Sequence, residues 1–135
     1  MSFNWNLYIL LAGTLIKKHK KKTDEHYFRT AISRAYYGAF GVTVALLESY
    51  GYTLPEQDTH KEFINKLKTI GKDRESRKAS RKMSLDFQRL WNDRKSADYD
   101  SITIFDHDQA ERNFILAQRI VKNIDEFEKN LDPNQ

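Results

Sequence analysis

Two short segments of the sequence combine arginine with tyrosine at spacings that bring the side chains together on a helix. In the first segment, Arg34 and Tyr37 are three residues apart. In the second, Arg94 and Asp98 are four apart, and Tyr99 follows at once. Residues three or four apart lie on one side of an α-helix. Arginine offers a planar fork of donors that matches phosphate, and tyrosine offers a face on which unpaired bases stack. The two segments therefore predict a site for a nucleotide or RNA.

The same residues also fit a purely structural role. An arginine inside a helical bundle needs a carboxylate or backbone partner, because an unpaired buried charge costs on the order of several kcal/mol. Asp98 could pair with either Arg34 or Arg94, while tyrosine hydroxyls complete a buried network. A pair along one helix is the less favoured choice, because an acid near a helix C-terminus opposes the dipole. Both interpretations require the two arginines to meet at one place.

Basic residues gather in two other stretches of a chain whose net charge is only +4. Residues 17–22 hold five lysines and no acid, and residues 66–82 hold eight lysines and arginines against two acids. Such segregation is typical of proteins that bind a polyanion, but lysines at the end of a helix are also favoured by its dipole. Nucleic-acid binding is the stronger interpretation if both stretches share one face. The candidate contacts are Lys17, Lys18, Lys20, Lys21, Lys22, Lys72, Arg74, Arg77, Lys78, Arg81 and Lys82.

The composition excludes several classes of protein. With 135 residues the chain suits one domain, expected over residues 1–130 with a frayed tail at 131–135. The absence of cysteine excludes disulfides, cysteine-ligated zinc and a cysteine nucleophile. No phosphate-binding glycine loop or nucleophile elbow is present, and no two histidines have a metal-binding helical spacing. We therefore expect neither a cofactor nor a metal. Residues 8–16 are too short an apolar stretch to cross a bilayer, and we expect a cytoplasmic protein.

Apolar residues recur at helical spacing along almost the whole chain, which predicts an all-α, up-and-down helical bundle. Four long helices are expected at about residues 4–21, 24–50, 76–96 and 106–127, with a short helix at about 59–70. Residues 98–105 are expected to form an irregular loop. Gly38 and Gly41 in the second helix favour the close approach of another backbone. Capping boxes are expected at Thr59 with Glu62 and at Asp106 with Gln109.

The segments Ala31–Phe40 (AISRAYYGAF) and Arg94–Asp100 (RKSADYD) resemble the HEPN domain superfamily, in particular its small, stand-alone prokaryotic branch. The resemblance covers about residues 24–127 and includes an intervening histidine, His60, and an alanine-rich last helix. It implies a helical bundle that is generally a homodimer. It also implies nucleotide or RNA binding, metal-independent RNA cleavage, or a toxin–antitoxin pairing with a small nucleotidyltransferase.

One departure from that family's pattern bears on catalysis. Ribonuclease members carry an arginine followed after four to six residues by histidine, and no histidine of this chain has an arginine at that distance. Arg94 matches the family's arginine, but Asp98 and Tyr99 stand where a histidine would act. Metal-free cleavage of RNA needs an acid and a base poised near neutral pH, whereas tyrosine titrates near ~10 and aspartate near ~4. The pattern therefore favours a binding module over an endoribonuclease.

Two further expectations concern surfaces. His60 lies in the first turn of the short helix, where it could contact an anion or simply be exposed. The first helix carries an apolar arc too wide for one packing face, formed by Trp5, Leu7, Tyr8, Leu10 and Leu11. We therefore expect the chain to form a homodimer.

Overall fold

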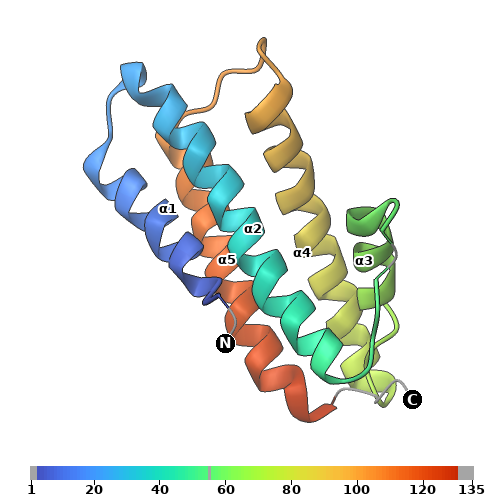
Figure 1. Cartoon of the computed structure of the whole chain (residues 1–135). Helices are drawn as coiled ribbons and strands as arrows, with labels where there is room; N and C mark the ends of the chain where they lie inside the picture. Colours follow the sequence, from blue (N-terminus) through green and yellow to red (C-terminus); the bar gives the residue numbers. More distant parts are fainter. Residues whose placement is uncertain (1–2, 55, 131–135) are drawn as a thin grey trace.

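Helices account for nearly all of the regular structure in the computed structural model, which describes residues 3–54 and 56–130. The all-α prediction of four long helices and one short helix is confirmed (Figure 1). The elements are α1 (Asn6–Lys18), α2 (Glu25–Ser49), α3 (Thr59–Leu67), α4 (Arg74–Tyr99) and α5 (His107–Phe127), with short 3-10 turns at Lys22–Asp24 and Glu128–Asn130. Within the described residues, no helix is both long and apolar enough to cross a membrane. The tail expected at 131–135 lies outside the described residues.

Helix α2 is the central element of the bundle. It packs against α1, α4 and α5, and Figure 1 shows it between α1 and α4 with α5 behind. Its buried stripe repeats every three or four residues, so one continuous face contacts the core. Phe28, Ile32, Ala35, Tyr36 and Ala39 from this stripe are almost fully buried. The short helix α3 packs against α4 and closes one side of the core.

Two glycines in α2 allow α1 to come close, as the sequence predicts. A Cβ atom at Gly38 would lie 2.5 Å from the Ile9 side chain and 3.1 Å from the Trp5 carbonyl oxygen. A Cβ atom at Gly41 would overlap the Trp5 indole. Because no side chain separates the two helices here, α1 lies against α2 and brings Tyr8 toward Arg34.

The start of α5 agrees with the sequence prediction, and the start of α3 differs from it. Asp106 and Gln109 form the predicted capping box, with the Gln109 amide donating to Asp106 Oδ1 at 2.8 Å. The capping box predicted at Thr59 is wrong, because Asp58 is the residue that precedes α3 and Thr59 is already helical. Asp58 has a left-handed backbone with φ 53°, and its side chain makes no capping bond. The tight turn that precedes α3 therefore moves its start one residue earlier in the chain than predicted.

The C-terminus of α4 lies three residues later than expected. Residues 98 and 99 were predicted to belong to a loop, but α4 continues through Tyr99. Arg29 of α2 stabilises this extension: its Nη1 donates to the carbonyl oxygens of Ser96 at 3.2 Å, Ala97 at 3.0 Å and Asp100 at 2.7 Å. These are carbonyls that a helix end leaves without intrahelical partners. A cation at this end is also attracted to the negative end of the helix dipole, which stabilises the helix.

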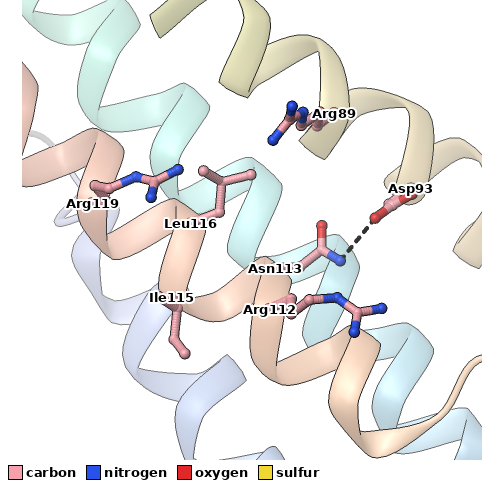
Figure 2. Close-up of a pocket in the computed structure, with 7 residues that line it drawn as sticks. All are labelled: Arg89, Asp93, Arg112, Asn113, Ile115, Leu116 and Arg119. Carbon is pink, nitrogen blue, oxygen red and sulfur yellow. Dashed lines mark hydrogen bonds between the residues drawn. The ribbon is translucent and has the colours of Figure 1, made fainter. Parts of the chain in front are cut away.

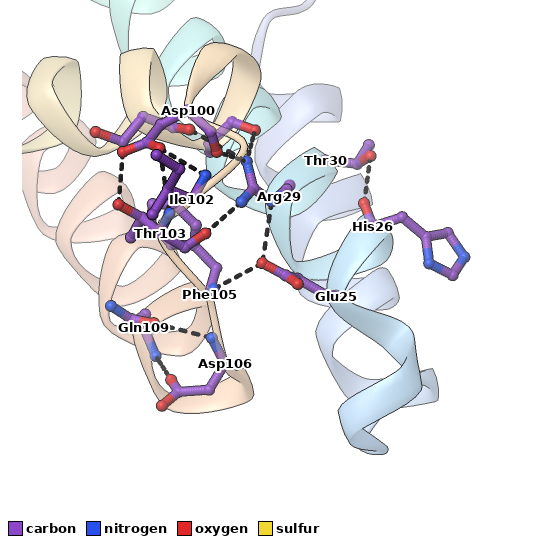
Figure 3. Close-up of polar contacts among 12 residues, drawn as sticks. Glu25, His26, Arg29, Thr30, Asp100, Ile102, Thr103, Phe105, Asp106 and Gln109 are labelled. Carbon is purple, nitrogen blue, oxygen red and sulfur yellow. Dashed lines mark hydrogen bonds and ion pairs between the residues drawn. The ribbon is translucent and has the colours of Figure 1, made fainter.

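We call this arrangement the Arg29 joint (Figure 3). Arg29 Nη2 donates to the Thr103 carbonyl, and Arg29 Nε lies 3.1 Å from Glu25 Oε2. The same Glu25 oxygen accepts the Phe105 N–H at 2.9 Å, and this bond is the main cause that lowers the pKa of Glu25. The joint therefore ties the start of α2 to the loop between α4 and α5.

Candidate functional site

Arg34 and Arg94 both lie close to one tyrosine ring. The guanidinium carbon of Arg94 is 4.9 Å from the centroid of the Tyr37 ring, and that of Arg34 is 5.4 Å from the same centroid. Arg34 also lies 4.7 Å from the ring centroid of Tyr8 on α1. The two arginines come from α2 and α4, which are separated along the chain but adjacent in the bundle. The structure thus brings both predicted segments to one place.

A chain of polar contacts joins the two arginines. Arg34 Nη2 donates to Ser33 Oγ at 3.3 Å, and Ser33 Oγ donates to Asp98 Oδ2 at 3.2 Å. Asp98 Oδ2 lies 2.8 Å from Arg94 Nε. We call Ser33, Arg34, Tyr37, Arg94 and Asp98 the Tyr37 cluster. It contains two cations and one carboxylate, so the cluster carries a net positive charge.

Arg94 and Asp98 form their ion pair along α4, although this arrangement is the less favoured one on a helix. It forms because Asp98 also accepts the Ser33 hydroxyl from α2, and because Arg29 compensates the dipole at this end of α4. The Arg94 side chain is 12% exposed and that of Asp98 is 27% exposed. The cluster is therefore partly buried and partly accessible to solvent. Its contacts stabilise the fold and still leave room for a ligand to reach it.

Two tyrosines of the site differ in their surroundings. Burial is the main cause that raises the pKa of Tyr37, with Arg94 and Arg34 opposing the rise and Asp98 and Tyr99 adding to it. Tyr37 therefore keeps its proton at neutral pH and acts as a ring face and a hydroxyl donor. Tyr99 is 78% exposed, and its ring centroid lies 5.5 Å from the Arg94 guanidinium. An exposed aromatic ring thus stands at the open side of the cluster.

His60 is connected to the cluster through Trp91. Its ring stacks on the Trp91 indole, with centroids 4.1 Å apart and planes 13° apart, and Trp91 lies 5.1 Å from the Arg94 guanidinium. His60 Nδ1 is 2.6 Å from the hydroxyl of the buried Tyr36. Burial, assisted by the nearby charge of Arg94, lowers the pKa of His60, so the ring is neutral at pH 7. Together His60 and Trp91 line a surface pocket of about 440 Å³.

The structure separates the two basic stretches. Lys17, Lys18, Lys20, Lys21 and Lys22 lie at the end of α1 and in the following turn, where α2 begins. The second stretch surrounds the start of α4, at the end of the bundle where α2 finishes (Figure 1). The Lys72 amide there donates to the Asn130 carbonyl, next to the end of α5. The two stretches therefore lie at opposite ends of the bundle, and their nucleic-acid role stays a prediction.

Several residues of the site were not anticipated from the sequence. Tyr8, Ser33 and Trp91 complete the surroundings of the two arginines. Of these, Ser33 and Trp91 had a signal, because Ser33 lies within the Ala31–Phe40 motif and Trp91 lies three residues before Arg94 on one helix. The start of α5 brings together His107, Asp108 and Glu111, whose possible ligand atoms lie within 4.8 Å of one another. Their grouping is remote from the Tyr37 cluster, since His107 contacts the Ile16 carbonyl of α1 at 3.0 Å.

The bundle and its paired arginines define a small all-α domain with a cationic, aromatic-lined site. A family model described as HEPN domain matches residues 8–127. The chain therefore belongs to the HEPN domain family, as the two motifs predict. A search of curated proteins and a search of solved structures each gave no significant match.

Proposed function

We propose that this protein is a HEPN-type nucleotide- or RNA-binding module that works as a homodimer, with the Tyr37 cluster as its binding site. One observation carries the proposal: two guanidiniums lie close to a single tyrosine ring, and polar contacts link both of them to one carboxylate, directly from Arg94 and through Ser33 from Arg34. Within the described residues, Arg94 Nε lies 2.8 Å from Asp98 Oδ2 without forming a hydrogen bond, and Arg34 donates through a single terminal nitrogen. The other N–H donors remain for phosphate oxygens, which arginine binds through two parallel bonds.

Aromatic rings around the cluster supply the second part of the recognition. Tyr99 is largely exposed beside Arg94, and Trp91 carries a stacked His60 next to it. Unpaired bases stack on such faces, whereas bases inside a duplex do not reach them. The proposal therefore favours single-stranded RNA or a free nucleotide over duplex.

Dimerisation is supported by an apolar surface on α1. Leu7, Leu10 and Leu11 are 49%, 64% and 43% exposed, so this part of the predicted arc is not covered within one chain, whereas Trp5 and Tyr8 are half-buried. A second copy would bury it. Light scattering after gel filtration should give about twice the 16.0 kDa chain mass. A small nucleotidyltransferase in a toxin–antitoxin-type pair is the partner that we propose to test by co-purification.

The experiment for the binding site is a titration of labelled single-stranded RNA by fluorescence anisotropy at several salt concentrations. We expect saturable binding that weakens as salt rises, because phosphate contacts release counterions. Arg34→Gln and Arg94→Gln should each weaken binding by about tenfold, the worth of one charge-assisted contact. Lys122→Gln on α5 is the matched control and should bind as wild type does. Undetectable affinity at low salt, or affinity that is insensitive to salt, would contradict the proposal.

The alternative function is a metal-independent endoribonuclease with its site at the dimer cleft. The observation in its favour is that Asp98 and the exposed Tyr99 adjoin Arg94 on the open side of the cluster. Arg94 would stabilise charge on the phosphate, and Asp98 or Tyr99 would transfer protons. Cleavage in the presence of EDTA should disappear in Arg94→Ala while circular dichroism stays unchanged. Equal cleavage by this variant would identify a contaminating nuclease.

A further inference from the structure

A second cationic hollow lies between α4 and α5, away from the Tyr37 cluster between α1, α2 and α4 (Figure 2). It has a volume of about 340 Å³ and is lined by three arginines: Arg89 from α4, and Arg112 and Arg119 from α5. Arg112 and Arg119 are seven residues apart, which is about two helical turns on one face. The lining of the hollow, which we call the arginine pocket, therefore combines two arginines from one helix with a third from the opposite helix.

Most of this positive charge is not neutralised by the protein. Arg119 Nη2 lies 3.7 Å from Asp86 Oδ1, a long contact, and Asp86 is buried. Arg89 and Arg112 form no ion pair with an acid of the described chain. Asp93, the acid among the lining residues, accepts a hydrogen bond from Asn113 Nδ2 at 3.0 Å. The lining thus holds one acid and three arginines.

The floor of the pocket is a fixed polar group. Asn113 is 4% exposed, and its Nδ2 donates both to Asp93 and to the Gln109 carbonyl at 2.8 Å. These two bonds use both donors of the amide and hold its plane, so its oxygen keeps one direction. Figure 2 shows this oxygen on the side of the amide away from the bond to Asp93, between Arg89 and α5. A ligand in the pocket therefore meets a positioned acceptor as well as the arginines.

One wall of the pocket is apolar. Leu116 lies between the two α5 arginines, and the nearby Ile115 is 52% exposed. Arginine forks suit phosphate, whereas an apolar wall suits a carbon skeleton or a flat ring. The combination selects against a bare anion and in favour of an organic molecule that carries one.

We propose that the arginine pocket binds a small phosphate monoester, with its phosphate held by Arg89, Arg112 and Arg119 and its organic group against Leu116 and Ile115. The donor set is unlike that of the Tyr37 cluster, because it contains neither a tyrosine nor a tryptophan. This inference does not depend on the proposed RNA-binding function. It concerns a different pair of helices and a compact ligand.

The test is a titration of the full, isotope-labelled chain with inorganic phosphate and with phenyl phosphate, followed by NMR at constant ionic strength. We expect saturable shifts of residues 89, 112–116 and 119 with both probes, and tighter binding of phenyl phosphate. Arg112→Gln and Arg119→Gln should each weaken phenyl phosphate binding by about tenfold. Both side chains are exposed, so the variants should fold as wild type does.

Lys122→Gln, which removes an exposed cation of α5 outside both sites, is the matched control and should leave the affinity for phenyl phosphate unchanged. Arg94→Gln shows whether the probe binds at the Tyr37 cluster instead. Linear, unsaturated shifts would overturn the proposal, and so would equal binding by Arg112→Gln and wild type. Loss of phenyl phosphate binding in Arg94→Gln alone would assign the ligand to the Tyr37 cluster and would also overturn it. Failure of RNA binding would leave this result untouched.

Discussion

The Arg29 joint and the Tyr37 cluster both centre on arginines near the end of α4, yet they use guanidinium groups in opposite ways. Arg29 donates to four backbone carbonyls and pairs with Glu25 (Figure 3). Arg94 has one carboxylate partner and lies near the rings of Tyr37, Trp91 and Tyr99. A saturated guanidinium holds a fold together, whereas one that faces aromatic rings with free donors can still bind a ligand.

Exposure does not explain this difference. The Arg29 side chain is 21% exposed and that of Arg94 only 12%. The more buried arginine is the one with fewer hydrogen bonds. The two arginines differ in the kind of partner. Carbonyl oxygens at a helix end each accept an N–H group of the guanidinium, whereas a ring face attracts the charge and leaves the N–H groups free. This distinction predicts different responses when each arginine is replaced.

The largest expected effect on stability is at the Arg29 joint. Arg29→Gln should lower the free energy of unfolding by about 2–3 kcal/mol, because it removes charge-assisted bonds to the end of α4 and the following loop. Urea unfolding followed by circular dichroism measures this quantity. A variant as stable as wild type would show that the loop holds without its cation.

A smaller loss of stability and a clear loss of binding are expected at the Tyr37 cluster. Arg94→Gln should cost about 1 kcal/mol of stability, since one ion pair is removed and Asp98 stays hydrogen-bonded to Ser33. The slope of RNA affinity against salt should fall by about one, as for the loss of a single phosphate contact. Arg94→Lys keeps the charge but loses the planar fork of donors, so its RNA affinity should lie between those of wild type and Arg94→Gln. A stability loss as large as that of Arg29→Gln would make Arg94 structural.

The smallest effect expected is a dependence of stability on pH that comes from His60. Burial lowers the pKa of His60 in the folded protein, so the unfolded chain binds the extra proton more readily. His60 therefore costs no stability above the ordinary histidine pKa near ~6.5, and it lowers the free energy of unfolding as the pH falls below that value. His60→Gln should flatten the change in unfolding free energy between about pH 7.5 and 5.5. The same slope in both proteins would assign it to another group.

Local patterns predict much of the fold. Apolar spacing specifies the helices, Asp106 and Gln109 specify a helix start, and Gly38 and Gly41 indicate where a neighbour comes close. Each depends on residues within one or two turns of one another, or on a missing side chain. The end of α4 was placed too early because its support, Arg29, lies almost seventy residues earlier in the chain.

The sequence by itself determined that this chain is an all-α HEPN bundle and that Arg34 and Arg94 belong to matching motifs, because helical period and motif spacing are local properties. Only the tertiary structure decided that the two guanidiniums share Tyr37, that His60 joins them through Trp91, and that the basic stretches lie at opposite ends. Each of these outcomes depends on how helices pair and which way the chain runs. Such long-range packing is selected by burial of the whole core rather than by any single segment.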